Sequence, residues 1–464
     1  MSDVIGDFEL HALTHLDGRN AHKLKSLRPI FSEFAWMRQR LLVMIRYVIY
    51  MYPFVSGKNL SRAKEKSLLH LHRVFSQNDA LRVKDIESKI NHDLKAVEMF
   101  FVTALKRENL EECIPYINVG IGSEDVNTIA FAHALTESIQ ILQQELSGTV
   151  AEIMKLAREY ADTTMVARTH GLPANITSFG KEMANTLLRL CDECEVFLSV
   201  KIFAKCSGEV GSFQAHFSAD RRIDWIKCTD SFIRSLGFLP HHGATQVLPY
   251  DSYSRLFHAA MRINTICIDF VQNLWLYIVA GYAHVSPILR EVGSAGMPHK
   301  VNPIYLEGAE GNLKMANMLF EGLARELPIN RLQRSFTDST MRRNVVIPIS
   351  FSLLAYQSIT EGLKRFVVDR KAIAADFFKH PEVWLESVKA YGMVHKVPDM
   401  FGMLKNETRG KVLTAEGLTR IIEQLPLTKL QKDELLALCR QSANPFPSAI
   451  VSEALTRTKK VFSL

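Results

Sequence analysis

Apolar residues recur at intervals of three and four along two long stretches of the chain, and a third stretch is almost entirely apolar. In residues 135–160 the spacing is carried by Leu135, Ile139, Leu142, Leu146, Val150, Ile153, Ala157 and Tyr160. Residues 181–200 show the same spacing, and residues 263–285 contain few polar side chains. This pattern predicts three long helices, and a helix that is apolar on all sides is buried in a large body or in an oligomer.

Polar and apolar residues do not alternate with a period of two over several segments, so we expect no sheet of consequence. The predicted fold class is therefore all-α. Three turn-rich stretches, residues 118–123, 169–174 and 291–303, carry glycine or proline between the helical segments. Long helices would hold these loops at their ends, and loops held on a rigid scaffold often carry functional side chains.

The helical pattern divides the chain into three predicted domains. Residues 1–112 form a series of shorter helices, and residues 113–368 contain the long helices together with the loop at 291–303. From about residue 369 the pattern breaks into short pieces around Pro381, Pro398, Pro426 and Pro445. Because proline interrupts helices, we expect a C-terminal domain of short helices over residues 369–464.

The charge balance argues against a nucleic-acid-binding protein. The 464 residues include 56 Lys+Arg and 49 Asp+Glu, which gives a net charge of +7. The densest basic runs are only two residues long, so they form no basic stripe. A mild positive balance is compatible with attraction of a small anionic substrate, and equally with no particular partner.

The cysteines and the apolar stretches indicate a cytoplasmic protein without a membrane span. The chain has seven cysteines, an odd number, and no secretory signal precedes them, so we expect a reducing compartment. Cys191 and Cys194 form a single C-x-x-C without a second pair at zinc spacing, which favours buried thiols over a metal site. The apolar stretches at 41–55 and 263–285 are both interrupted by charged residues.

The loop at residues 293–303 combines several groups that could carry chemistry. Gly293 and Gly296 permit backbone mobility, while Ser294, Lys300 and Asn302 offer a base or nucleophile, a cation and an amide. A flexible loop with such side chains is a candidate for a functional site. Taken alone, a surface turn with solvated side chains explains it equally well.

Three further segments carry weaker signals. His170 lies between a helical segment and a turn, where a histidine is more often solvated or satisfied than catalytic. In residues 91–93 (NHD), the histidine and the aspartate either orient one another or cap a helix, and capping is the default interpretation. Residues 122–125 (GSED) are typical of a helix start, with acidic side chains at the positive end of the helix dipole.

The order of these motifs resembles the fumarase/aspartase superfamily, in which three separated regions meet in one active site. The resemblance narrows to the bacterial adenylosuccinate lyases. It is carried by residues 180–185 (GKEMAN), 297–303 (MPHKVNP), 310–312 (EGN), 331–334 (RLQR), 337–340 (TDST), 408–411 (TRGK) and 415–417 (AEG). The match extends over essentially the whole chain from Asp17, and the MPHKVNP run is highly specific.

The resemblance implies a three-domain helical fold and a homotetramer. In such a tetramer the long central helices form a twenty-helix core, and three subunits build each active site. The implied reaction is β-elimination of fumarate from adenylosuccinate, which yields AMP, and from succinylaminoimidazole carboxamide ribotide in purine biosynthesis. The resemblance implies neither a metal nor an organic cofactor, and the only other partner is the small-molecule substrate.

The family's catalytic roles fall on five residues of this chain. Ser294 corresponds to the base on a mobile loop, and Lys300 and Asn302 correspond to the groups that stabilise the dianionic intermediate. His170 corresponds to the acid that protonates the leaving nitrogen. His92 matches a residue that, with Asp93, orients the catalytic groups.

The resemblance also assigns residues that hold the substrate. Arg19 and Arg334 match phosphate contacts, with Arg331 adding to the phosphate field, since a guanidinium pairs with phosphate oxygens in bidentate fashion. Ser123 and Thr169 match carboxylate contacts, and Gln246 matches a contact to the succinyl end. The remaining predicted contacts are Asn20, Asn91, Asp93 and Asn330.

Several positions depart from the family pattern. A second serine is replaced by Ala295, and Gly296 follows it where a side chain is usual. The other replacements are Asn20 for an aromatic residue, Asn118 for a histidine, Gly122 for a threonine, Leu172 for a glutamine, Leu248 for an acidic residue and Asn330 for a serine. A lost charge-assisted hydrogen bond costs about 1.5–3 kcal/mol, so several losses together would slow catalysis greatly unless they are compensated.

These departures keep two alternatives open. One is a diverged paralogue that cleaves another N-succinyl, phosphorylated substrate, which the changed pocket positions favour (Asn20, Gly122, Leu172 and Leu248). The other is a weakly active or non-catalytic tetramer that binds nucleotides. Retention of Ser294 and Lys300 argues against the second alternative.

Overall fold

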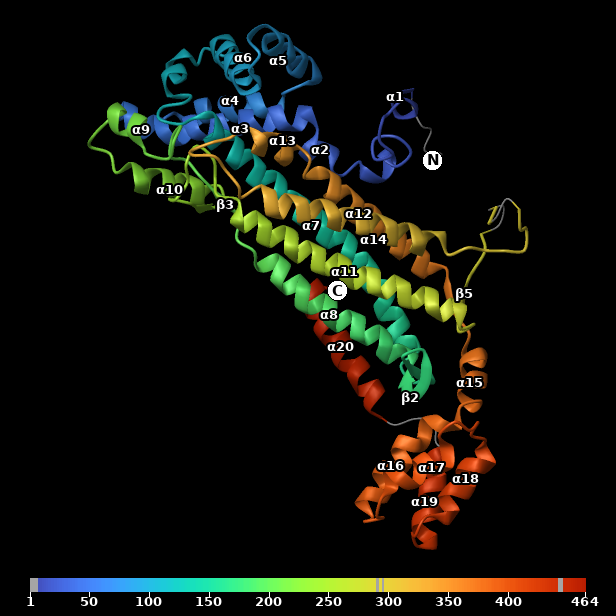
Figure 1. Ribbon diagram of the computed structural model, residues 1–464. Coiled ribbons are helices and arrows are strands. Elements are labelled where there is room, and N and C mark those ends of the chain that lie inside the picture. Colours follow the sequence, from blue (N-terminus) through green and yellow to red (C-terminus); the bar gives the residue numbers. More distant parts are fainter. Residues whose placement is uncertain (1–6, 289–291, 294–295, 441–444) are drawn as a thin grey trace. The chain divides into compact units, whose positions relative to one another are not determined.

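The computed structural model describes residues 7–288, 292–293, 296–440 and 445–464 (Figure 1). The part before the long helices consists of short helices and one of 24 residues, in agreement with the sequence pattern. Its elements are α1 Asp7–Leu10, η1 Ala21–Leu24, α2 Arg28–Phe31, α3 Glu33–Ser56, α4 Arg62–Arg73, α5 Gln77–Ile90, α6 Asp93–Arg107 and η2 Glu111–Tyr116.

Five long helices follow, and they include the three that the sequence predicts. They are α7 Ser123–Glu159, α8 Phe179–Ser199, α11 Asp251–Val279, α12 Ile304–Glu326 and α14 Val346–Lys364. The predicted helix over 263–285 is wrong at both ends, because α11 begins earlier and stops at Val279. Gly281 has a φ of +72°, and Tyr282 N–H donates to the carbonyl of Tyr277, which closes the helix as a Schellman motif does.

Short strands and helices connect the long helices. They are β1 Thr164–Thr169, β2 Leu172–Ser178, β3 Phe203–Ala204, α9 Gln214–Ala219, α10 Trp225–Ser235, β4 Leu239–Pro240, β5 Ala283–Val285, α13 Thr337–Arg343 and β6 Phe366–Val368. The strands pair as β1–β2, β3–β4 and β5–β6, so every sheet in the described residues has only two strands. The expected all-α fold class is confirmed, with these small ribbons added.

The C-terminal part is built of short helices, as the prolines predict, and ends in a longer one. Its elements are α15 Arg370–Phe378, η3 Pro381–Trp384, α16 Leu385–Val394, α17 Met400–Thr408, α18 Ala415–Gln424, α19 Lys429–Arg440 and α20 Phe446–Phe462. A small core of its own joins α16 to α19, and it includes Val388, Ile422 and Leu435.

The chain divides into two compact units. The first comprises Met1–Gln144, Val196–Asn264 and Asn312–Leu354, and the second comprises Glu145–Glu195, Thr265–Gly311 and Ala355–Leu464. The domain boundaries predicted from the sequence, near residues 112 and 368, stay predictions.

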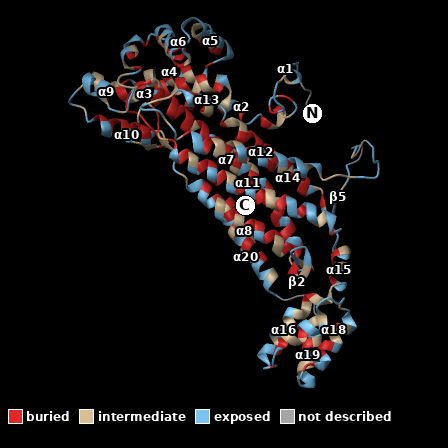
Figure 2. Ribbon diagram, viewed as in Figure 1, coloured by how far each residue is buried: buried red, intermediate tan, exposed pale blue. Residues whose placement is uncertain are grey.

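The core of the first unit forms around α3. The middle of this helix is a run of apolar residues, and Leu41, Ile45 and Val48 are fully buried. Figure 2 colours much of the ribbon around α3 as buried. They share one cluster with Phe101 of α6 and Phe232 of α10. Ser32 caps α3 by accepting a hydrogen bond from Ala35 N–H at 3.2 Å, which fixes where the helix begins.

Two observations concern the sequence expectations about membranes and thiols. Within the described residues, no helix is long and apolar enough to cross a lipid bilayer. All seven cysteines are free, and six of them are buried, including Cys191 and Cys194 on α8. The C-x-x-C pair is therefore part of a buried helix face, as expected.

Candidate active site

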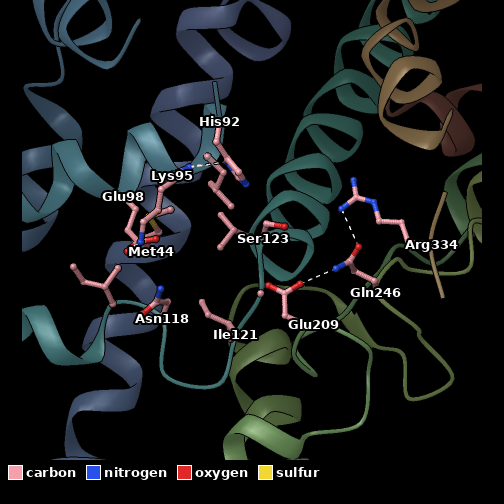
Figure 3. A pocket seen from close by; sticks show the side chains of 14 residues that line it. Met44, His92, Lys95, Glu98, Asn118, Ile121, Ser123, Glu209, Gln246 and Arg334 are labelled. Atoms are coloured by element: carbon pink, nitrogen blue, oxygen red, sulfur yellow. Dashed lines mark hydrogen bonds and ion pairs between the residues drawn. The ribbon is translucent and has the colours of Figure 1, made fainter. Parts of the chain in front are cut away.

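Two adjoining pockets in the first unit bring six of the predicted site residues together. A pocket of about 440 Å³ is lined by His92, Ser123, Gln246 and Arg334 (Figure 3). A second pocket of about 260 Å³ shares three of these four residues and adds Asn91 and Asp93. These side chains come from the start of α6, the start of α7 and the loops before α11 and α13. Residues far apart in sequence thus line one polar region.

His92 is the N-cap of α6. Its Nδ1 accepts a hydrogen bond from Lys95 N–H at 3.2 Å, so the capping interpretation is confirmed, with the imidazole as the cap. Since Nδ1 is the acceptor, the neutral ring carries its hydrogen on Nε2. The ring lines the pocket, where Nε2–H offers a fixed donor.

Asp93 is held between two arginines. Its Oδ2 accepts hydrogen bonds from Arg40 Nη2 and Arg343 Nη2, both at 2.8 Å, and its Oδ1 accepts one from Leu94 N–H. Burial by itself would raise the pKa of Asp93, but Arg40 outweighs it and the pKa falls to about 2. Arg40 also donates to Asn127 Oδ1, so Asp93 ties α6 to α3 and to α7. In this arrangement Asp93 positions the start of α6.

The N-terminus of α7 lies in the wall of the larger pocket. Ser123 is its first residue, as the acidic pattern predicts, and Gly122 precedes it at the N-cap position. Because Gly122 has no side chain, the usual capping hydroxyl is missing. Asp125 reaches back instead, and its Oδ2 accepts a hydrogen bond from Gly122 N–H at 2.8 Å.

A buried ion pair fixes the loop that faces this helix start. Lys205 Nζ lies 2.6 Å from Asp125 Oδ1, and the two side chains are 0% and 1% exposed. The Asp125 carboxylate also accepts hydrogen bonds from Ser207 N–H and Gly208 N–H. Burial raises the pKa of Asp125, while Lys205 and the backbone donors oppose that rise. The pair therefore holds residues 205–208 against the first turn of α7.

The next residue along this loop, Glu209, enters the pocket wall. Gln246 Nε2 donates to Glu209 Oε2 at 2.7 Å, and Gln246 Oε1 accepts from Arg334 Nη1 at 3.2 Å (Figure 3). Gln246 is itself placed by its backbone N–H, which donates to the carbonyl of Gln333. Two predicted residues, Gln246 and Arg334, are thus joined in one chain of hydrogen bonds with a residue that the sequence did not point to.

Arg334 is shared between the pocket and the buried carboxylate of Glu124. Glu124 Oε1 lies 3.1 Å from Arg334 Nη2, and its Oε2 accepts from Arg342 Nη1 at 2.9 Å. Glu124 is 2% exposed. Burial would raise its pKa, but Arg342 and Arg334 outweigh burial and lower the pKa to about 2. A phosphate at Arg334 would have to compete with this carboxylate.

The depressed pKa of Glu124 predicts a pH-dependent contribution to stability. A carboxyl whose pKa is lowered on folding stabilises the fold above its unfolded value of 4.5, and this contribution is lost as the pH falls toward about 2. We expect Glu124→Gln to lower the melting temperature at pH 7, and the difference from wild type to shrink between pH 4.5 and 2. Thermal unfolding over this pH range measures it.

Glu361→Gln is the matched control, because Glu361 pairs with Lys364 at 2.6 Å while both side chains are half exposed. Exposed pairs contribute about 0–1 kcal/mol, so this variant should melt close to wild type at every pH. A Glu124→Gln protein with the wild-type melting temperature at pH 7 would refute the stabilising role of Glu124.

The remaining predicted residues of the first unit lie outside the two pockets. Asn330 serves its own loop: its Oδ1 accepts from Arg331 N–H and Ser335 N–H, and its Nδ2 donates to the carbonyl of Gln333. Arg331 is exposed. Arg19 is also exposed, and the Asn20 side chain bonds to His15 at 2.8 Å. The phosphate roles of Arg19, Asn330 and Arg331 stay predictions.

The second unit contains His170 and Thr169, on a β-hairpin. The sequence placed His170 after a helix, and this was wrong, because residues 164–169 and 172–178 pair as antiparallel strands. His170 and Gly171 form the two-residue turn, with φ values of +54° and +78°. Such a turn needs a left-handed conformation at both positions, which matches the twist of the strands.

The hairpin is anchored, while its tip is exposed. Arg168 donates to Tyr282 Oη and to Asp376 Oδ2, each at 2.6 Å, which fixes the end of β1 against α15 and the segment before β5. Thr169, His170 and Leu172 are all exposed, with Leu172 at 68%. The imidazole therefore projects from a rigid base into solvent-accessible space.

The loop at 291–303 is described except for residues 291, 294 and 295. The predicted base Ser294 and its neighbour Ala295 lie outside the described residues. Lys300 is exposed, and Asn302 Nδ2 donates to the carbonyl of Gly293 at 3.3 Å. A side chain at Gly293 would collide with the carbonyl of Lys300, so glycine allows the two arms of the loop to approach.

The departures from the family pattern fall in different surroundings. Asn118 and Gly122 line the larger pocket, as expected for positions that face a ligand. Leu248 was expected to place apolar surface at the ligand, but it is 0% exposed and belongs to the core. Leucine in place of an acidic residue at this position therefore affects the packing of the core.

Sequence reasoning missed Glu209, and a partial signal for it exists. Residues 206–212 carry two glycines with positive φ, Gly208 at +85° and Gly211 at +75°. Glycine in such a loop marks a close approach of backbone to another element. The contact of this loop with the start of α7 depends on tertiary structure.

Within the described residues, no group of three His, Cys, Asp or Glu side chains is placed to hold a metal.

Comparisons with known proteins extend over nearly the whole chain. Residues 55–317 match the family described as lyase, and residues 330–442 match the adenylosuccinate lyase C-terminal family. Two solved structures share the fold: a fumarate lyase from Mesorhizobium sp. BNC1 (TM-score 0.70, 13% identity, 93% of this chain and 97% of that one), and the 3-carboxy-cis,cis-muconate lactonizing enzyme from Pseudomonas putida (TM-score 0.67, 16% identity, 95% and 98%).

Curated relatives give the closer relationship. The chain is 35% identical to adenylosuccinate lyase of Legionella pneumophila (strain Corby), over 95% of this chain and 98% of the relative. It is 36% identical to the enzyme of Vibrio cholerae (97% and 99%) and 34% identical to that of Escherichia coli K12 (92% and 95%). The chain therefore belongs to the adenylosuccinate lyase family of the fumarase/aspartase superfamily.

Proposed function

We propose that this protein cleaves adenylosuccinate into AMP and fumarate, and that it also releases fumarate from succinylaminoimidazole carboxamide ribotide in purine biosynthesis. One observation carries the proposal: the pocket at the start of α7 gathers the hydroxyl of Ser123, the amide of Gln246 and the guanidinium of Arg334 beside His92. Such donors suit an anionic substrate. Membership of the family supports the same reaction.

The reaction requires a base, an acid and donors for developing charge. The base removes a proton from the carbon next to a carboxylate, and the electrons of that C–H bond finally form the double bond of fumarate. The C–N bond breaks, and its electron pair leaves with the nitrogen, which takes up a proton. We propose Ser294 as the base, His170 as the acid, and Lys300 and Asn302 as the donors that meet the negative charge of the intermediate.

We further propose a homotetramer in which several subunits build each active site. His170, Lys300 and Asn302 belong to the second unit of the chain, whereas the pocket belongs to the first. On α11, Trp275, Leu276 and Val279 are 44%, 54% and 65% exposed, an apolar surface of the kind that subunit contacts cover. A monomer with full activity in sedimentation measurements at micromolar concentration would refute this assembly.

We propose a cytoplasmic location, which the seven free thiols support.

The diverged-paralogue alternative keeps one observation in its favour. The pocket holds Glu209 beside Gly122, so it carries a negative charge where a dicarboxylate substrate would bring its own. A different N-succinyl compound would then be the better substrate.

The experiment is fumarate release from purified protein with adenylosuccinate, with the Ser294→Ala protein as the blank. Turnover above the blank supports the proposed reaction. If wild type and the blank are equally inactive while AMP still binds, the paralogue is favoured. Turnover that is undiminished in Ser294→Ala would remove Ser294 from the role of base.

A further inference from the structure

Glu209 and Gly122 fit together sterically at the wall of the larger pocket. A Cβ atom built on Gly122 would lie 2.6 Å from both the Cδ and the Oε1 of Glu209. Any other residue at position 122 would force the carboxylate to move. The carboxylate therefore occupies the volume that a side chain at the N-cap of α7 would fill.

The surroundings of this carboxylate are those of an anion site. Gln246 Nε2 donates to it, and Gln246 is held by Arg334. Ser123 and Asn118 line the same pocket and add a hydroxyl and an amide, and Lys95 adds a cation that pairs with the pocket residue Glu98 at 2.6 Å. The positive end of α7, a helix of 37 residues, faces the same place. These polar groups are placed to bind a carboxylate, and the carboxylate of Glu209 itself lies among them.

The position of Glu209 is built into the fold. The buried pair of Asp125 and Lys205 holds residues 205–208 against the first turn of α7. Glu209 follows immediately, so its backbone is placed next to Gly122, while its side chain is exposed and can rotate away. Because its backbone is fixed and its side chain can rotate, Glu209 can occupy the pocket when no ligand is bound. It can leave the pocket when a ligand competes for the same place.

We propose that Glu209 is a specificity-determining residue that occupies a substrate carboxylate subsite, with Gly122 providing the space for it. This inference rests on the proposed function, since fumarate and adenylosuccinate are the dicarboxylates concerned. A ligand carboxylate must displace the Glu209 carboxylate or bind beside it against charge repulsion. Glu209 thus weakens binding of dicarboxylates and leaves ligands without carboxylates unaffected.

The test is direct binding of fumarate by calorimetry, with AMP as the control ligand because it carries no carboxylate. Glu209→Gln keeps the shape and removes the charge, so we expect it to bind fumarate about tenfold more tightly than wild type. Affinity for AMP should change less than about twofold. In turnover, the KM for adenylosuccinate should fall more than kcat changes.

Gly122→Ala provides an independent variant. Its φ lies outside the left-handed region, so alanine is tolerated, and the added methyl should push the Glu209 side chain out of the pocket. We expect Gly122→Ala also to tighten fumarate binding. The gains from Gly122→Ala and Glu209→Gln should not add in the double variant, because both remove the same negative charge from the same place.

The outcomes separate this inference from the proposed function. Equal or weaker fumarate binding in Glu209→Gln overturns the inference, and so does absence of fumarate binding at millimolar concentration in all variants. Either result can occur while wild type still cleaves adenylosuccinate. Conversely, tighter fumarate binding in Glu209→Gln upholds the inference even if wild type fails to turn adenylosuccinate over.

Discussion

Replacing His170 by asparagine is expected to lower the turnover of adenylosuccinate by about 10²–10⁴-fold, the usual contribution of a general acid. The nitrogen that leaves must be protonated as the C–N bond breaks, and an amide cannot supply that proton. Asparagine is the best replacement for the backbone, because it tolerates the left-handed conformation at φ +54° that the turn imposes. The loss would thus report on the imidazole, with the hairpin intact.

Steady-state kinetics with adenylosuccinate measures this effect, together with AMP binding, which should stay close to wild type. Leu172→Gln is the control on the same hairpin, because Leu172 is exposed at the start of β2 and glutamine restores a polar side chain there. That variant should keep at least the wild-type rate. A His170→Asn protein with wild-type kcat would show that another group protonates the nitrogen.

The second large effect concerns the buried ion pair behind the pocket. Asp125→Asn leaves the ammonium of Lys205 without its counterion at 0% exposure. Breaking a buried pair on one side costs about 3–5 kcal/mol, because the partner left behind is neither solvated nor compensated. We expect a clearly lower melting temperature, measured at one fixed protein concentration because subunit association also contributes.

Asp85→Asn is the matched control for this variant. Asp85 pairs with Lys89 at the same distance of 2.6 Å, but the two side chains are 63% and 68% exposed. The same chemical change there should cost at most about 1 kcal/mol. Equal melting temperatures for Asp125→Asn and Asp85→Asn would show that the buried pair does not stabilise the fold.

The sequence predicted three of the five long helices, because the signal of a helix is local. A helix repeats every 3.6 residues, so the apolar positions from Leu135 to Tyr160 lie along one stripe, whatever the rest of the chain does. The start of α7 was also predictable, since its acidic residues interact with their own helix end. The hairpin at His170 escaped because buried and exposed residues do not alternate along its two strands, so no period of two stands out.

The candidate site was predictable as a set of residues and less so as an arrangement. The resemblance pointed to His92, Ser123, Gln246 and Arg334, which line one pocket. It gave no warning that Glu124 shares Arg334, or that Leu248 lies in the core. These facts depend on contacts between positions far apart in sequence, such as Glu124 and Arg334, which no local pattern records.

The burial of the cysteines has a practical consequence for spectroscopy. Burial raises the pKa of Cys439, the most accessible of the seven thiols, to about 11, and that of Cys194 to about 12. Alkylating dyes react with thiolates, which are therefore scarce at neutral pH in the native protein. A cysteine introduced at an exposed position such as Gly296 would be labelled against a silent background, and its fluorescence would report on changes around residue 296 when a ligand binds.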